Sequence, residues 1–264
     1  MKFFFMVFSF TSLLLLSSSF ASSFLRHIKK RRASFSSSSS HEFMERATRL
    51  WISLFVRDLN LCPFSSSVLI NKSPSPLRII TSNTSSSSSF LVKKEFLKEC
   101  NLLIKSKEIK TSIIIYPNLV NFIHYLDFYS DLESLLEEKG LDSHLQLASF
   151  HPNYIFQGEE KEEEKEESKA EENEEESKLD GRVTCYTNRS PFPMVHLLKV
   201  AQVAEAIAAF QGEGSTEVIW RRNMETMERL GVEEIKRINS EIFKKAFDSF
   251  ESSEKKDCNG ERMD

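Results

Sequence analysis

The sequence is poor in glycine and proline, with seven of each among its 264 residues. It contains no Gly-rich phosphate-binding loop of the GxGxxG or GxxxxGK[ST] type, which argues against the nucleotide-binding folds built on those loops. It also lacks heptads, a collagen-like pattern and internal repeats, so fibrous and repeat architectures are excluded. With 40% hydrophobic and 28% charged residues, the chain fits one globular domain with appendages.

Cysteine is scarce as well, and the four cysteines (Cys62, Cys100, Cys185 and Cys258) are scattered without a CxxC pair. A fold held together by disulfides would have a shorter chain that is denser in cysteine. The cysteine pattern therefore indicates a reducing compartment, and it provides no short spacing of the kind that marks a zinc site.

Charge is distributed unevenly behind the formal net charge of −4. The first forty residues carry +6 and no acid, whereas Glu159–Asp180 carries −9. The rest of the chain is nearly neutral, so it lacks the basic patch that a nucleic-acid-binding surface needs. The acidic run has too few apolar residues to join a core, and we expect a disordered insertion at residues 159–180. A metal-buffering or partner-binding role for this run is the alternative.

Residues 1–40 have the layout of targeting signals. Lys2 precedes the apolar stretch Phe3–Leu16, which is shorter than the roughly 20 residues of a membrane-spanning helix. The next segment, Leu25–Ser40, is basic and rich in serine, as transit peptides are. The two segments in series, with Phe24 between them, resemble the bipartite presequences of secondary plastids. We therefore expect a removable presequence, a plastid location and no membrane span in the mature protein; a mitochondrial or secretory destination is the alternative.

The body, residues 41–250, alternates between helical and strand patterns, and a polar tail, 251–264, follows it. This alternation predicts an α/β (or α+β) domain, with a small three-stranded sheet layered with helices and an all-helical C-terminal part. Whether the strands are parallel or ferredoxin-like stays open. The expected strands are Leu77–Thr81, Thr111–Tyr116 and Leu145–Phe150. The expected helices are His41–Leu61, Phe90–Ile104, Asn121–Lys139, Phe192–Phe210, Glu217–Leu230 and Val232–Phe250.

Four short segments carry polar groups that a fold alone does not require: LNLCPF at 59–64, ASFHPNY at 148–154, TNRSPFPMVHLL at 187–198 and RRNMET at 221–226. Together and in this order they resemble the domain of unknown function 1415 family, over roughly residues 45–232. The sequence departs from the family pattern at Asp58, where glycine is usual, and at the acidic insertion. The resemblance implies no particular activity, cofactor or metal.

An anion site is predicted around Ser190, which reads as the N-cap of a helix with Pro191 at its first position. Such a helix start offers backbone N–H groups to an anion. Arg189 adds a planar fork of donors suited to carboxylate or phosphate, and Asn188 can complete the shell. The alternative is a well-capped helix with an exposed arginine. Arg222 and Asn223 could supply further donors, or could be a solvent-exposed pair.

His151, His196 and Cys62 are the candidate catalytic residues. Both histidines suit general acid–base work or metal ligation because their ordinary pKa is close to neutral. Structural histidines and a buried structural cysteine are the alternatives, since Cys62 stands at a helix C-terminus that disfavours the thiolate. A zinc site made of these three side chains is a further alternative.

Three hypotheses about function follow from these residues. The first is an enzyme that acts on a small anionic metabolite, with an Arg/Ser/Asn anion pocket and a histidine acid–base group. The second is a non-catalytic module that binds or senses a small anion. The third is an interaction or assembly factor that uses the acidic run. The first two predict that Asn188, Arg189, Ser190, His151 and His196 line one pocket, with Cys62 and Arg222 near its wall.

Overall fold

The computed structural model describes residues 37–63, 65–69, 75–82, 89–156, 183–209 and 216–260. The chain divides into two units, Met1–Ser34 and Phe35–Asp264, and all of the described residues belong to the second. Its elements in chain order are α2 (Ser37–Trp51), the π-helix η1 (Ile52–Arg57), α3 (Ser65–Val68), β1 (Leu77–Thr81), α4 (Ser89–Lys105), β2 (Thr111–Ile115), α5 (Phe122–Glu138), β3 (Leu145–Phe150), the 3₁₀-helix η2 (Val183–Thr187), β4 (Met194–Lys199), α7 (Val200–Ala209) and α8 (Thr216–Gly260).

The domain is a mixed α/β fold around a four-stranded sheet with the order β1-β2-β4-β3. β1 and β2 pair in parallel, and β4 pairs antiparallel with both β2 and β3. β1, β2 and β3 therefore run in one direction, and β4 is inserted between the last two in the opposite direction. α4 connects the parallel neighbours β1 and β2, which need such a crossover, and α5 connects β2 to β3, which run in the same direction with β4 between them.

The expectation of a three-stranded sheet was wrong, because the predicted helix Phe192–Phe210 begins with strand β4. β4 is central, and both its neighbours bond to it. Its sequence, MVHLLK, is an apolar run interrupted by His196, and periodicity cannot distinguish such a run from part of a buried helix. The second half of the predicted segment is helical, as α7, and follows β4 without an intervening turn.

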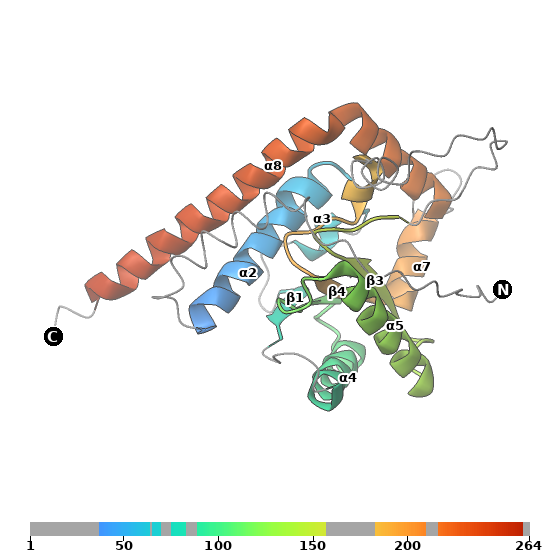
Figure 1. Cartoon of the computed structure of the whole chain (residues 1–264). Helices are drawn as coiled ribbons and strands as arrows, with labels where there is room; N and C mark the ends of the chain where they lie inside the picture. Colours follow the sequence, from blue (N-terminus) through green and yellow to red (C-terminus); the bar gives the residue numbers. More distant parts are fainter. Residues whose placement is uncertain are drawn as a thin grey trace, which may run out of the picture. The chain divides into compact units, whose positions relative to one another are not determined.

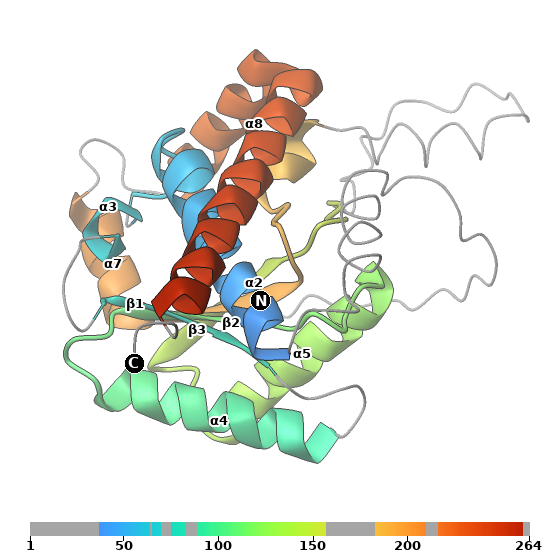
Figure 2. The same cartoon turned by 90° about the vertical axis from the view of Figure 1, so that its left-hand side faces the viewer.

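α4 and α5 lie on one face of the sheet (Figure 2), where the main hydrophobic core forms. Leu132 and Leu136 of α5, Phe96 of α4, and Val195 and Leu197 of β4 are all buried in this core. α5 has clear signals at both ends. The side chain of Asn121 accepts from the backbone N–H of His124 at 3.0 Å, and Gly140 turns the chain at a φ of 65°, as predicted.

α2 and the long helix α8 lie on the opposite face of the sheet (Figure 1). Phe43 and Phe250 pack edge-to-face with ring centroids 6.1 Å apart, and join the middle of α2 to the C-terminal part of α8. α8 is two helical segments that meet at Gly231, whose φ of 73° and ψ of 160° are not helical. This break is where the sequence predicted a boundary between two helices.

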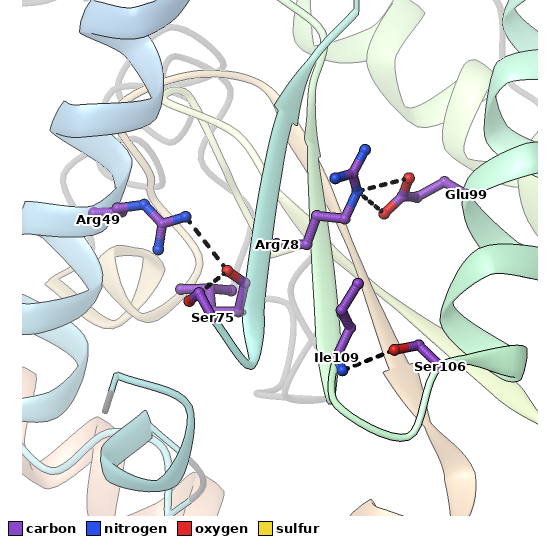
Figure 3. A network of polar contacts seen from close by, with 7 residues as sticks. Arg49, Ser75, Arg78, Glu99, Ser106 and Ile109 are labelled. Atoms are coloured by element: carbon purple, nitrogen blue, oxygen red, sulfur yellow. Dashed lines mark hydrogen bonds and ion pairs between the residues drawn. The ribbon is translucent and has the colours of Figure 1, made fainter. Parts of the chain in front are cut away.

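Polar contacts attach β1 to a helix on each face (Figure 3). Arg49 of α2 donates from Nη2 to the carbonyl of Leu77 at 3.3 Å, and the Ser75 hydroxyl donates to the same oxygen at 3.0 Å. On the other face, Nε of Arg78 donates to both carboxylate oxygens of Glu99, at 2.9 and 3.1 Å. Glu99 is buried in α4, and this pairing compensates for the removal of its charge from water.

The other predicted elements have mixed outcomes. β3 has the predicted bounds, and β1, β2 and α4 agree to within a residue. The first helical segment ends at Arg57 rather than Leu61, and Asn60 turns the chain with a φ of 55°. Residues 1–36 of the predicted presequence, 1–40, the acidic run, 159–180, and the last four residues of the predicted tail lie outside the described residues, whereas Ser37–Ser40 belong to α2. Within the described part, no helix combines the length and apolar character that crossing a membrane requires.

Candidate functional site

Strand β4 brings two of the four sequence motifs to one edge of the sheet. Met194, the first residue of β4, pairs with Ile115 at the end of β2 and with Phe150 at the end of β3. The His151 motif follows β3 and the Asn188–Ser190 motif precedes β4, so both lie where the parallel strands end. We call this edge the carboxyl edge; it is the edge at which ligands bind in many α/β proteins.

His151 is buried at the carboxyl edge, and both of its ring nitrogens have backbone partners. Nδ1 accepts from the N–H of Asn153 at 3.0 Å, so Nε2 carries the proton and donates to the carbonyl of Leu119, also at 3.0 Å. The rings of Phe122 and Tyr125 lie 5.2 and 5.0 Å from it, centroid to centroid. Burial lowers the pKa of His151 to about 4, so the ring is neutral at physiological pH.

Asn188 and Ser190 bond to neighbouring backbone groups. Nδ2 of Asn188 donates to the carbonyl of Ser149 at 3.3 Å, and the carbonyl of Asn188 accepts from the N–H of His151 at 3.3 Å. The hydroxyl of Ser190 is buried and donates to the carbonyl of Phe192 at 2.7 Å. The prediction that Ser190 caps a helix was wrong, because the chain proceeds from there into β4. The anion site expected at a helix N-terminus is therefore not formed at this residue.

Arg189 is held in place by two tyrosines. Its Nε donates to the carbonyl of Tyr154 at 3.0 Å, and its guanidinium carbon lies 4.7 Å from the ring centroid of Tyr186. The second contact is a cation–π interaction, which suits the flat guanidinium group. Lys236 of α8 is close enough for the charge of Arg189 to lower its pKa, although a stronger hydrogen bond with Glu233 raises it overall.

His196 lies in the middle of β4, away from the carboxyl edge. Its Nε2 is 2.6 Å from the hydroxyl oxygen of Thr111, and that hydroxyl donates its one hydrogen to the carbonyl of Leu197 at 2.7 Å. The hydroxyl must therefore accept from His196, which places the ring proton on Nε2. Burial lowers the pKa of His196 to about 4, so this ring is also neutral at physiological pH.

The other two motifs meet each other through a pair of hydrogen bonds. Nη2 of Arg222 donates to the carbonyl of Asn60 at 2.6 Å, and Nδ2 of Asn223 donates to the carbonyl of Leu61 at 2.8 Å. Cys62 follows these residues and is half-buried; its carbonyl accepts from the N–H and the hydroxyl of Ser65. The two α8 side chains thus hold the backbone of the cysteine motif.

The structure thus joins the four motifs in two pairs: His151 with Asn188–Ser190, and Asn60–Cys62 with Arg222 and Asn223. Across the described ranges, no cluster of three or more histidine, cysteine or acidic side chains could hold a metal ion. Sequence reasoning missed Tyr154, Tyr186 and Lys236. Tyr154 stands in a quoted motif, but Tyr186 and Lys236 reach Arg189 only through the fold.

A comparison with protein-family models identifies a family for this chain. Residues 43–170 and 172–237 match the family model described as protein of unknown function (DUF1415). Most of the chain is covered, and all four motifs fall inside the matched ranges. The resemblance inferred from those motifs is therefore confirmed. Comparisons with curated proteins and with solved structures give no match.

Proposed function

The chain belongs to the DUF1415 family, and we propose that it binds a small anionic molecule, a carboxylate or a phosphate, through Arg189 at the carboxyl edge. The observation that carries this proposal is the way the guanidinium group is held, by the Tyr154 carbonyl on one side and the Tyr186 ring beneath it. A guanidinium fixed in this way keeps a planar set of donors in one orientation, which lowers the entropy lost when an anion binds.

A second positive charge supports an anionic ligand. Lys236 and Arg189 are close enough to repel each other electrostatically. An anion bound beside both would replace this repulsion with attraction, and would gain charge-assisted hydrogen bonds. Lys236 extends from α8 and is exposed; its ammonium group donates to Glu233 at 3.0 Å and would turn from this partner towards the ligand.

In this proposal Asn188, Ser190 and His151 position the backbone that carries Arg189. The side chains of Asn188 and Ser190 donate to backbone carbonyls, and the backbone N–H of His151 donates to the carbonyl of Asn188. Arg222 and Asn223 similarly hold the cysteine motif. A neutral His151 with both nitrogens occupied is poorly suited to moving a proton. The geometry at Arg189 therefore favours the binding module over the enzyme with His151 as its acid–base group.

The test is calorimetry of the wild-type protein and two variants with inorganic phosphate and with succinate. Arg189→Gln should weaken binding of the preferred anion by about 1.5–3 kcal/mol, the range for hydrogen bonds to charged groups. Arg237→Gln is the matched control, because Arg237 neighbours Lys236 on α8 and pairs with Glu234 and Glu241 on the helix surface. Equal weakening in both variants, or no binding to the wild type, would refute the proposal.

A further inference from the structure

Within the part of the chain that the structure describes, one half of the sheet face beneath α2 is buried, and the other half is buried only in part. The side chains of β1 and β2 that point to this face are buried: Leu77, Ile79, Thr81, Thr111, Ile113 and Ile115. On β3 and β4 the corresponding residues are Met194, which is buried, and then Gln146, which is exposed, and Ala148, Phe150, His196 and Leu198, which are half-exposed. Strand residues alternate between faces, so these last five side chains share one surface, which we call the uncovered half-face.

His196 is the polar centre of this half-face. Its Nε2–H donates to the hydroxyl of Thr111, which leaves Nδ1 with a lone pair and no hydrogen. Within the described residues, no donor bonds to Nδ1. The ring is strongly desolvated but its side chain keeps part of its surface accessible. His196 thus combines a desolvated ring with a side chain that protein does not fully enclose.

Aromatic rings border His196 on the same face. The ring of Phe150 lies 6.3 Å from that of His196, and the ring of Trp51 lies 5.6 Å from that of Phe150, both centroid to centroid. The indole N–H of Trp51 is buried without a hydrogen-bond partner. The Trp51 N–H is therefore enclosed by protein, and it is the His196 end of this row that offers an acceptor and a ring surface to a flat molecule with a polar group.

The side chains of this half-face do not favour an anion as the occupant. His196 is neutral, and the nearest lysine on the same strand, Lys199, points to the opposite face and donates to the carbonyl of Ser106 at 2.6 Å. The occupant must also bring a hydrogen, because Nδ1 only accepts.

We propose that the uncovered half-face binds a small, uncharged aromatic molecule whose O–H or N–H group donates to Nδ1 of His196 while its ring packs beside Phe150. This site is separate from the one at Arg189 and does not depend on it. Gln146, exposed on the same half-face, offers an amide to further polar groups of the ligand.

Histidine NMR of the full chain tests the proposal directly. Long-range ¹H–¹⁵N spectra of the ¹⁵N-histidine protein at neutral pH should show His196 as the Nε2–H tautomer. Phenol should shift its Nδ1 resonance saturably, and anisole, which has the same ring but no O–H, should not. A proton on Nδ1, no shift with phenol, or equal shifts with both compounds would each overturn the proposal.

Variants supply the second measurement. His196→Phe keeps a ring and leaves Thr111 bonded to Leu197, so it should fold and should bind phenol at least tenfold more weakly than the wild type does. His124→Phe, which alters an exposed histidine at the start of α5, is the matched control and should bind phenol normally. Arg189→Gln should also bind phenol normally, which separates this site from the proposed anion site. If His196→Phe does not fold, the comparison of phenol with anisole on the wild type decides the question.

Discussion

Nδ1 of His151 accepts a hydrogen bond from the backbone N–H of Asn153 at 3.0 Å, and this contact fixes the protonation of a ring that the sequence suggested as a catalytic group. To protonate the ring, the fold would have to break this bond and place a charge among aromatic side chains. The neutral ring is therefore part of the folded structure, and the protein should lose stability where histidine normally takes up a proton.

The first prediction concerns pH. The pKa of His151 is lowered from 6.5 to about 4 by burial, so between these values the unfolded chain binds a proton that the native state does not. The free energy of unfolding should consequently fall as pH drops from 6.5 towards 4, by up to about 1.4 kcal/mol per pH unit for this residue. His196, with the same shift, should add a similar slope. Urea denaturation across this range measures both.

His151→Gln should remove one of these two contributions. At neutral pH the variant should have a lower free energy of unfolding than the wild type, because two backbone groups lose their hydrogen-bond partner. Towards pH 4 this difference in free energy should become smaller. An unchanged pH slope would show that His151 titrates normally in the native state.

A second prediction concerns Tyr125, which connects two strands. Its buried hydroxyl donates to the carbonyl of Met194 at 2.8 Å and accepts from the N–H of Phe150 at 2.9 Å. Tyr125→Phe should lower the free energy of unfolding by about 1–3 kcal/mol, because two backbone groups are left without a partner. Tyr129→Phe, one turn later and half-buried, should have a smaller effect in the same denaturation experiment. Equal effects would contradict this account.

Much of the fold could be predicted because its elements carry local signals. β3 alternates and ends at His151-Pro152, and α5 has a capping asparagine and a terminal glycine. β4 could not be recognised in the same way. Its backbone pairs with both β2 and β3, which is a property of the whole sheet, and Ser190-Pro191 resembles a helix start.

The candidate site was only partly predictable, for a similar reason. The sequence motifs contain His151 and Arg189, and the sheet does bring these two residues to one edge. However, the sequence does not show that the partners of His151 are backbone groups of Leu119 and Asn153. The contact between Arg222 and Asn60 joins residues that are 162 positions apart, and no local pattern predicts such a bond.

A third prediction concerns location. We propose that the two segments within residues 1–40 deliver the protein to a plastid, as their composition indicates. A fluorescent fusion of residues 1–45 should accumulate in that organelle in a cell with secondary plastids. A fusion that lacks Met1–Phe24 should fail to enter the secretory route that precedes import. A diffuse cytosolic signal from the longer fusion would contradict the proposal.

The last prediction concerns Asn60, which adopts a positive φ of 55°. Asparagine and glycine tolerate this conformation, whereas other L-residues are strained by roughly 1–2 kcal/mol. Asn60→Ala should therefore lower the free energy of unfolding by about that amount, and Asn60→Gly should be close to neutral. Both variants keep the backbone carbonyl that accepts from Arg222, so the comparison isolates the backbone. Equal destabilisation by alanine and glycine would instead show that the side chain of Asn60 stabilises the cysteine motif.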